Sequence, residues 1–307
     1  MRRGVVLVAL VGSIAIACSS SSGRPSAKPR TTGTTAPPTT AAGAPVPSTL
    51  PDGVAPGTTV VLSLPVDGVT RSYRLHAPAA LDPGRPAPLV VVLHGAMGNA
   101  ARVETRYHWD PLSDRDGFFV VYPQGSLDQW NAVLDSRADD DVRYLTALLD
   151  HLEGTFLIDR TRIYVAGMSN GAAMAYRIGC ALSDRVAAIA PVEGSTPGCQ
   201  PSQPLSMVVV HGLADQTVTF AGAQRSLTAW RGYDGCPADA QVQRDGPVAH
   251  STWAPCAEGT TVELYTVDGG GHEWPGSSPP LAGHDPPSPD LDATQVIWDF
   301  FRRQARP

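Results

Sequence analysis

Arg162-Ile163-Tyr164-Val165-Ala166-Gly167-Met168-Ser169-Asn170-Gly171 is the stretch that decides the predicted fold. It joins an apolar run to the helix-like segment 172–178 through a turn that contains the pattern G-x-S-x-G. With a strand before it and a helix after it, this pattern forms a nucleophile elbow, a sharp turn that strains the serine backbone. The hydroxyl of Ser169 is then expected above the sheet at a helix N-terminus, which favours developing negative charge.

Other apolar runs predict strands that are buried on both faces and that alternate with helices. The expected strands cover residues 60–64, 71–76, 88–93, 117–122, 163–166, 186–192, 207–210 and 262–267, and the expected helices cover 141–152 and 293–303. Aspartates precede both helices as caps, Asp139 or Asp140 for the first and Asp290 or Asp292 for the second. The pattern predicts an α/β fold, a mostly parallel eight-stranded sheet with helices on both faces. Eight strands with the serine turn after the fifth form the α/β-hydrolase arrangement.

A serine hydroxyl becomes a good nucleophile when a histidine takes its proton and a carboxylate fixes the tautomer of that histidine. In this arrangement the order along the chain is Ser, Asp or Glu, His. The histidines after Ser169 are His211, His250, His272 and His284. We predict His272 as the base, because the glycine-rich segment 269–275 follows the last expected strand. His284, in a proline-rich loop, is the second candidate.

Asp215 is the predicted acid, because it follows the expected strand 207–210 and so lies at the same edge of the sheet as the histidine loop. Asp268 is the alternative, although it is close to His272 along the chain. In this fold the first strand-to-helix loop and the residue after the serine donate the two backbone N–H groups of an oxyanion hole. These groups belong to Ala96, in His94-Gly95-Ala96, and to Asn170.

Two tryptophans, Trp274 and Trp130, are candidate walls for an acyl or aromatic group of a substrate, and packing in the core is the alternative for both. We predict no metal ion and no organic cofactor.

The N-terminus has the features of an export signal followed by a linker. Residues 1–17 read as a signal peptide, with a basic start and an apolar run too short to span a bilayer comfortably. Ala15-Ile16-Ala17-Cys18 resembles a lipobox, so Cys18 is expected to carry a lipid, and simple cleavage with release is the alternative. Residues 18–57 are a Ser/Thr/Pro-rich tether that cannot bury enough apolar surface to fold. The catalytic domain is expected over 58–307, on the outer side of the cell membrane or secreted.

The formal net charge of the chain is −6, and loss of Arg2 and Arg3 with the signal peptide would bring it to −6 − 2 = −8. This acidic balance argues against nucleic acid as a partner, since nucleic-acid binding requires clustered Lys and Arg. The expected partners are an ester substrate and, through Cys18, a membrane.

The four remaining cysteines are Cys180, Cys199, Cys236 and Cys256, an even number in an exported chain, which predicts two disulfides. Three pairings are possible. We favour Cys180–Cys199 with Cys236–Cys256, because each bond closes a local loop. A zinc site is the competing interpretation, and no C-x-x-C or H-x-x-H spacing supports it.

Six segments within residues 60–303 resemble the esterase/polyhydroxybutyrate depolymerase family, which lies close to feruloyl and acetylxylan esterases and includes actinobacterial lipoproteins. They are LVVVLHG, DDDVRYL, RIYVAGMSNGAAMAYRIGC, HGLADQTV, GGGHEWPG and DATQVIWDFF. The resemblance implies Ser169 as nucleophile, Asp215 as acid and His272 as base. Ala96 stands where many depolymerases carry cysteine.

These observations predict a serine esterase that acts on hydroxybutyrate-oligomer, feruloyl or acetyl esters through an acyl-enzyme. Because the base must be neutral, activity is expected to rise toward neutral or mildly alkaline pH. An exopeptidase of the same fold and a non-catalytic sugar- or lipid-binding surface lipoprotein are the alternatives.

Overall fold

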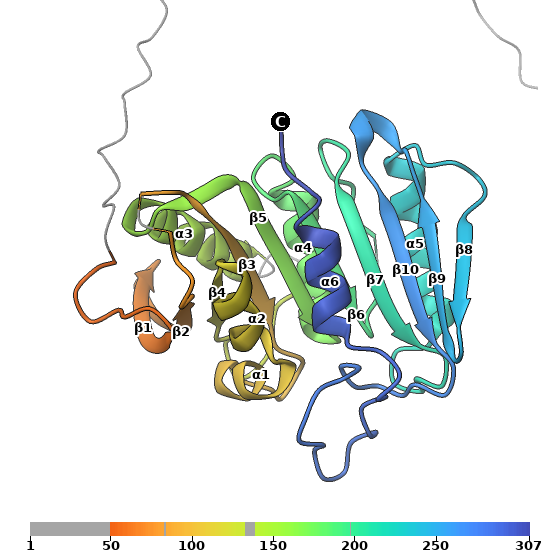
Figure 1. Cartoon of the computed structure of the whole chain (residues 1–307), viewed down its shortest axis with the longest axis horizontal. Coiled ribbons are helices and arrows are strands. Elements are labelled where there is room, and N and C mark those ends of the chain that lie inside the picture. Colours follow the sequence, from red (N-terminus) through yellow and green to blue (C-terminus); the bar gives the residue numbers. More distant parts are fainter. Residues whose placement is uncertain (1–49, 83, 133–138, 197) are drawn as a thin grey trace, which may run out of the picture. The chain divides into compact units, whose positions relative to one another are not determined.

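A computed structural model describes residues 50–82, 84–132, 139–196 and 198–307 (Figure 1). The expected signal peptide, Cys18 and the tether up to residue 49 lie outside the described residues. The first strand begins at Thr58, and the side chains of Leu50 and Val54 already pack against the core before it. No helix in the described ranges is both long and apolar enough to cross a bilayer.

The described residues form one ten-stranded sheet in the order β1-β2-β4-β3-β5-β6-β7-β10-β9-β8 (Figure 1). The strands are β1 (Thr58–Val66), β2 (Val69–Ala77), β3 (Ala87–Leu93), β4 (Phe119–Pro123), β5 (Ile158–Met168), β6 (Ala188–Val192), β7 (Ser206–Gly212), β8 (Gln241–Asp245), β9 (Val248–Trp253) and β10 (Val262–Val267). The six central strands, from β4 to β10, are parallel, and the pairs β1–β2 and β9–β8 are antiparallel additions at the two ends.

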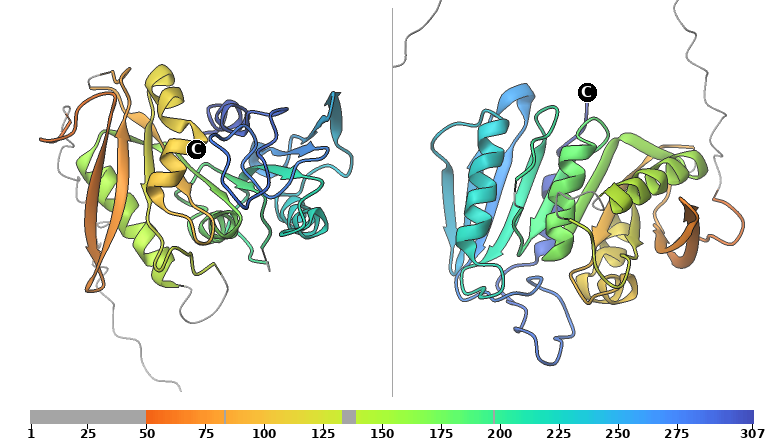
Figure 2. Two further views of the ribbon diagram at one scale, coloured as in Figure 1. Left: turned by 90° about the horizontal axis from the view of Figure 1, so that it is seen from below. Right: turned by 180° about the vertical axis from the view of Figure 1, so that it is seen from behind.

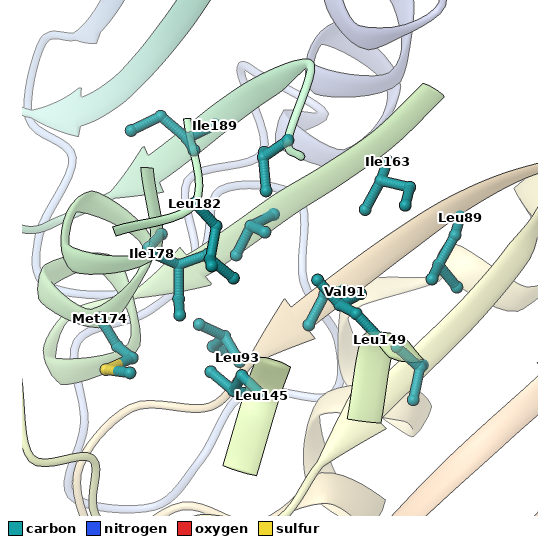
Figure 3. Close-up of a cluster of buried hydrophobic side chains, with 14 of the residues drawn as sticks. Leu89, Val91, Leu93, Leu145, Leu149, Ile163, Met174, Ile178, Leu182 and Ile189 are labelled. Carbon is teal, nitrogen blue, oxygen red and sulfur yellow. The ribbon is translucent and has the colours of Figure 1, made fainter. Parts of the chain in front are cut away.

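Helices cover both faces of the sheet, as Figure 2 shows. They are α1 (Ala100–Tyr107), α2 (Trp109–Asp116), α3 (Asp139–Thr155), α4 (Asn170–Ala181), α5 (Phe220–Tyr233) and α6 (Ala293–Phe301). The core under α3, α4 and α5 includes Leu89, Val91 and Leu93 of β3 (Figure 3), and the core under α1, α2 and α6 includes Val90 and Val92. Since successive side chains of a strand point to opposite faces, the apolar run of β3 supplies both cores.

The mostly parallel α/β sheet is confirmed, and the expected number of eight strands is wrong. All eight expected strands are present, with Ser169 directly after β5. The two additional strands form the hairpin β8–β9, in which every residue of β8 is exposed. A strand with no buried face lacks the apolar alternation that marks a strand in a sequence.

The helix starts differ in part from the expected caps. Asp292 caps α6, with its Oδ1 accepting from the backbone N–H of Gln295 at 3.0 Å. Asp139 and Asp140 lie inside the first turn of α3, where their charge favours the positive end of the helix.

Two disulfides, Cys180–Cys199 and Cys236–Cys256, join residues 19 and 20 positions apart, in the pairing favoured from the sequence. Cys180 lies in the last turn of α4, and Cys236 follows α5. Both helices start at the carboxyl ends of parallel strands and run back, so both disulfides lie at the amino edge of the sheet, opposite Ser169.

Candidate active site

The turn between β5 and α4 holds Ser169 in the strained conformation expected of a nucleophile elbow. Its φ of 56° and ψ of −117° lie in a region that L-residues rarely adopt. Both flanking glycines are required, because a side chain at either position would collide with neighbouring backbone. A Cβ at Gly167 would lie 2.3 Å from the carbonyl oxygen of Gly171, and one at Gly171 would lie 2.5 Å from those of Leu93 and His94.

Three side chains from separate loops form one chain of hydrogen bonds at the carboxyl edge of the sheet. Ser169 Oγ lies 2.9 Å from His272 Nε2, and His272 Nδ1 lies 2.7 Å from Asp215 Oδ2. Because the carboxylate can only accept, the network assigns the imidazole proton to Nδ1 and leaves Nε2 to accept from the hydroxyl. The arrangement can therefore withdraw a proton from the serine.

Asp215 is 2% exposed and follows β7 in a turn that satisfies its second oxygen. Oδ1 accepts from the backbone N–H groups of Thr217 and Val218, at 2.7 and 2.9 Å. Burial alone would raise the pKa of Asp215, but the hydrogen bonds from His272 and from these two N–H groups outweigh it and lower the pKa. The carboxyl is therefore ionised at neutral pH and able to stabilise an imidazolium.

The alternative acid and bases take no part in this hydrogen-bond chain. Asp268 is exposed and pairs with Arg244, at 3.3 Å between Oδ2 and Nη1. His250 lies on β9 and hydrogen-bonds to Glu263 at 2.9 Å. His284 is exposed at the rim of the cavity described below.

Two contacts anchor the loop that carries His272. The backbone N–H of His272 donates to Asp285 Oδ2 at 2.7 Å. The next residue, Glu273, forms a buried ion pair with Arg106 of α1 at 3.1 Å, and the same guanidinium donates to the carbonyl of Pro279 at 2.9 Å. Neither anchor was predicted, because a single charged residue in a loop gives no sequence pattern.

The loop after β3 places Ala96 beside the elbow. A Cβ at Gly95 would lie 3.5 Å from that of Ser169, so the two segments are in van der Waals contact, and Ala96 and Ser169 line the same cavity. The buried ring of His94 accepts from the N–H of Gly125 at 2.9 Å and donates through Nδ1 to the carbonyl of Gly95 at 2.8 Å. Burial lowers the pKa of His94, so a neutral imidazole holds this loop.

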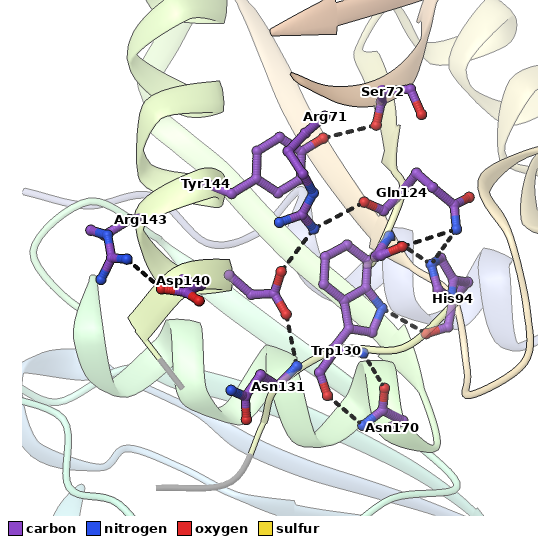
Figure 4. Close-up of polar contacts among 12 residues, drawn as sticks. Arg71, Ser72, His94, Gln124, Trp130, Asn131, Asp140, Arg143, Tyr144 and Asn170 are labelled. Atoms are coloured by element: carbon purple, nitrogen blue, oxygen red, sulfur yellow. Dashed lines mark hydrogen bonds and ion pairs between the residues drawn. The ribbon is translucent and has the colours of Figure 1, made fainter. Parts of the chain in front are cut away.

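Trp130 connects this loop to the start of α4 (Figure 4). Its indole N–H donates to the carbonyl of His94 at 2.9 Å. Its backbone N–H donates to Oδ1 of Asn170 at 2.6 Å, and its carbonyl accepts from Nδ2 of Asn170 at 3.0 Å. These bonds fix the two segments that carry the N–H groups of Ala96 and Asn170, as a preorganised oxyanion site requires.

The interpretation of Trp274 and Trp130 as cavity walls is wrong. Trp274 is 0% exposed, stacks on Tyr107 with 4.3 Å between ring centroids, and donates to Oγ1 of Thr294 at 3.1 Å. Trp130 is 3% exposed and packs in the core under α3. Each indole N–H finds an acceptor in the interior, which is the condition for burying a tryptophan.

A cavity of about 80 Å³ adjoins Ser169 and His272. Its apolar lining comes from Val103, Tyr107, Met168 and Leu281, and its polar lining includes Asn99, Arg102, Arg106 and Glu273. An apolar recess beside the hydroxyl can receive the acyl part of a small ester.

Within the described ranges, one group of three side chains has the spacing of metal ligands, namely Glu193, His211 and Asp215, with ligand atoms within 4.8 Å of one another. These residues do not fit a metal site. Nε2 of His211, the nitrogen that faces both carboxyls, donates to the carbonyl of Val218 at 2.9 Å, and Oδ2 of Asp215 accepts from His272.

The chain is similar to several proteins named as esterases. The putative esterase NocK of Nocardia uniformis subsp. tsuyamanensis is 31% identical, over 74% of this chain and 77% of that protein. The bifunctional acetylxylan esterase/xylanase XynS20E of Neocallimastix patriciarum is 28% identical over 76% of this chain, which spans only 33% of that relative. The solved acetyl xylan esterase from Aspergillus awamori shares the fold, with a TM-score of 0.61 at 17% identity over 79% of this chain and 99% of that one.

A family model described as esterase PHB depolymerase matches residues 71–243, more than half of the chain. Because the family model describes esterases and these relatives are named as esterases, the protein is a carboxylic ester hydrolase. The chain belongs to the esterase PHB depolymerase family.

Proposed function

We propose that the protein is a serine esterase in which Ser169 is the nucleophile, His272 the general base and Asp215 the acid of a catalytic triad. The observation that carries the proposal is the continuous hydrogen-bond chain from Ser169 through His272 to Asp215. The strained serine backbone and the loops around it support the same assignment.

In the first half of the reaction, Ser169 Oγ attacks the ester carbonyl while His272 Nε2 takes its proton. The negative charge that develops on the carbonyl oxygen is stabilised by the N–H groups of Ala96 and Asn170. Asp215 stabilises the imidazolium. The imidazolium then protonates the leaving alcohol, and the acyl group stays on Ser169.

In the second half, a water molecule takes the place of the alcohol. His272 removes its proton, the hydroxide attacks the acyl carbonyl, and the proton passes to Ser169 Oγ as the acid leaves. Both halves use the same base and the same N–H donors, and neither step calls for a metal ion or an organic cofactor.

We propose acetyl, feruloyl or hydroxybutyrate-oligomer esters as substrates. Support comes from the apolar recess beside Ser169, from the family description and from a relative named an acetylxylan esterase. A panel of methyl ferulate, acetylated xylan and hydroxybutyrate oligomers would rank these classes.

We also propose that residues 1–17 direct export and that Cys18 anchors the domain 58–307, through the tether 18–57, to the outer face of the membrane. The support is the basic and apolar start, followed by Ala15-Ile16-Ala17-Cys18. Cys18→Ser is expected to move the protein from the membrane fraction to the medium, and unchanged fractionation would contradict the anchor.

The proposed activity is tested with short-chain p-nitrophenyl esters beside p-nitroanilide dipeptides. We expect ester hydrolysis that saturates with substrate and peptide hydrolysis that is far slower. Faster cleavage of the peptides would establish an exopeptidase instead, and the absence of both activities would favour a binding protein.

A further inference from the structure

A buried carboxyl lies beside the proposed triad and has no part in the mechanism above. Glu193 directly follows β6, is 0% exposed and has a φ of 46°. Its N–H donates to the carbonyl of Val210 in β7 at 3.0 Å, and a Cβ on the next residue, Gly194, would lie 2.3 Å from that of Ala172 in α4. The strained backbone is thus fixed between β7 and the elbow helix, and such strain concentrates at functional sites.

The two oxygens of Glu193 have different surroundings. Oε1 accepts from the backbone N–H of Gly212 at 2.8 Å. Oε2 points toward Asp215 and His211, with Nε2 of His211 at 3.5 Å from it and at 3.7 Å from Oδ2 of Asp215. That imidazole N–H is already donated to the carbonyl of Val218. In the described part of the chain, no N–H or hydroxyl group donates a hydrogen bond to Oε2.

Oxygens of the two carboxyls lie within 4.8 Å of each other and both side chains are buried, which opposes ionisation of both at once. The negative charge is more stable on Asp215, because Asp215 accepts hydrogen bonds from the ring of His272 and from the N–H groups of Thr217 and Val218. Glu193 accepts one hydrogen bond, from Gly212. The proton is therefore on Glu193. Its place is Oε2, because that oxygen accepts no hydrogen bond from the residues that the structure describes.

We propose that Glu193 is a positioning residue of the triad, which carries a proton on Oε2 and donates it in a hydrogen bond to the carboxylate of Asp215. This inference rests on the proposed function. The added donor holds Asp215 in the orientation that His272 requires, and it does so without adding a second negative charge beside the imidazole.

The electrostatic surroundings of Glu193 agree with a neutral carboxyl. Burial raises the pKa of Glu193 well above its usual range, the N–H of Gly212 opposes this rise, and the charges of Asp215 and Asp285 add to it. His211 also faces Glu193, and because burial lowers the pKa of His211, it brings no positive charge that would favour ionisation.

Glu193→Gln and Glu193→Met separate this proposal from a purely structural role. In Glu193→Gln the amide oxygen can still accept from Gly212 and the amide NH₂ can still donate to Asp215. We expect its kcat to stay within about threefold of the wild type, and the pH–kcat profiles of the two proteins to superimpose. Glu193→Met removes the donor, so its kcat per titrated active site is expected to fall about 10- to 100-fold with KM unchanged, as for the loss of one hydrogen bond to a charged group.

If Glu193 were ionised instead, Glu193→Gln would remove a negative charge near His272. The imidazolium would be less stable, and the acid limb of the pH–kcat profile would move to lower pH. That shift, or full kcat in Glu193→Met, would overturn the proposal.

The infrared carbonyl stretch of a protonated carboxyl provides a readout that does not depend on catalysis. We expect Glu193→Gln to lose one such band at pH 7, and an unchanged spectrum would overturn the proposal even if Glu193→Met does not fold. For the kinetic comparison, Asp234→Asn is the matched control, a buried carboxyl at the opposite edge of the sheet, for which we expect unchanged kcat. Because the infrared readout needs no substrate, failure of the esterase assignment would be recognised separately, as hydrolysis that Ser169→Ala leaves intact.

Discussion

The two edges of the sheet each bury a carboxyl with one unpartnered oxygen, Glu193 at the carboxyl edge and Asp234 at the amino edge, among the residues that the structure describes. At the carboxyl edge, defined here by Ser169, Glu193 and Asp215, the buried carboxyl lies beside a second carboxyl and two residues have positive φ. At the amino edge, defined here by Asp234 and the two disulfides, the carboxyl accepts from the N–H of Leu205 at 3.1 Å.

This difference indicates that the two edges have different roles. Strain and buried polar groups at the carboxyl edge lower stability, as is common at functional sites. The amino edge has covalent links that restrict the unfolded chain. Changes at the carboxyl edge should therefore alter catalysis, and changes at the amino edge should alter stability alone.

Ser169→Ala is expected to have the largest effect, a fall of at least about 10⁴-fold in kcat/KM with no loss of stability, because it removes the nucleophile and no packing. Ser169→Gly should be equally inactive yet more stable than Ser169→Ala, by about 1 kcal/mol, since glycine adopts a φ of 56° without strain. Ester hydrolysis and thermal unfolding measure the two effects. Equal stability of the two variants would contradict the strain.

Asp215→Asn should lower kcat about 10⁴-fold, because an amide in place of Oδ2 no longer fixes the proton of His272 on Nδ1. Asp268→Asn, at the exposed alternative acid, is the matched control and should leave kcat unchanged. Steady-state kinetics on a p-nitrophenyl ester measures both. Comparable losses in the two variants would show that the acid has been misassigned.

Removal of the disulfide Cys236–Cys256 by a double Cys→Ser substitution should lower the free energy of unfolding by about 3 kcal/mol, as expected for a closed loop of about 20 residues. The kcat of the folded protein should not change. Chemical denaturation and kinetics at a temperature well below the unfolding transition test both statements. A lower kcat in the folded variant would contradict the view that the amino edge affects stability alone.

A further expected effect is a pH dependence of stability at the amino edge. Burial raises the pKa of Asp234 to about 7, and the N–H of Leu205 opposes this rise. Between the ordinary aspartate pKa of about 4 and pH 7, the folded protein holds a proton that the unfolded chain releases, so rising pH favours unfolding. Against Asp234→Asn, the wild type should lose about 1.4 kcal/mol per pH unit over this window and no more above it.

Denaturation of the wild type and Asp234→Asn from pH 4 to 9 measures this slope. Parallel stability curves for the two proteins would show that Asp234 ionises normally. The corresponding comparison with Glu193→Gln should show a slope of the same sign, because burial also raises the pKa of Glu193.

The sequence predicted those parts of the molecule that produce a recognisable pattern of residues along the chain. Buried strands such as β3 are β-branched runs, and the residues 167–171 form an elbow whose glycines have a steric reason. We could predict that Ser169, Asp215 and His272 lie close together, because each follows a strand and their order along the chain fits the fold.

What the sequence did not predict depends on contacts between distant residues. β8 is exposed along its whole length and has no apolar alternation. Glu193 is a lone acid after a strand, and only its neighbours in space distinguish it from a surface residue. Trp130 and Trp274 have the size and polarity of cavity walls and of core residues alike, and the packing places both in the core.

The most direct test of the account is a map of the residue that a fluorophosphonate probe modifies. Peptide mass spectrometry of the labelled wild type should find one adduct, on Ser169, and Asp215→Asn should label far more slowly because its histidine no longer activates the hydroxyl. An adduct on another residue, or labelling of Ser169→Ala at the wild-type rate, would contradict the assignment of the nucleophile and the mechanism built on it.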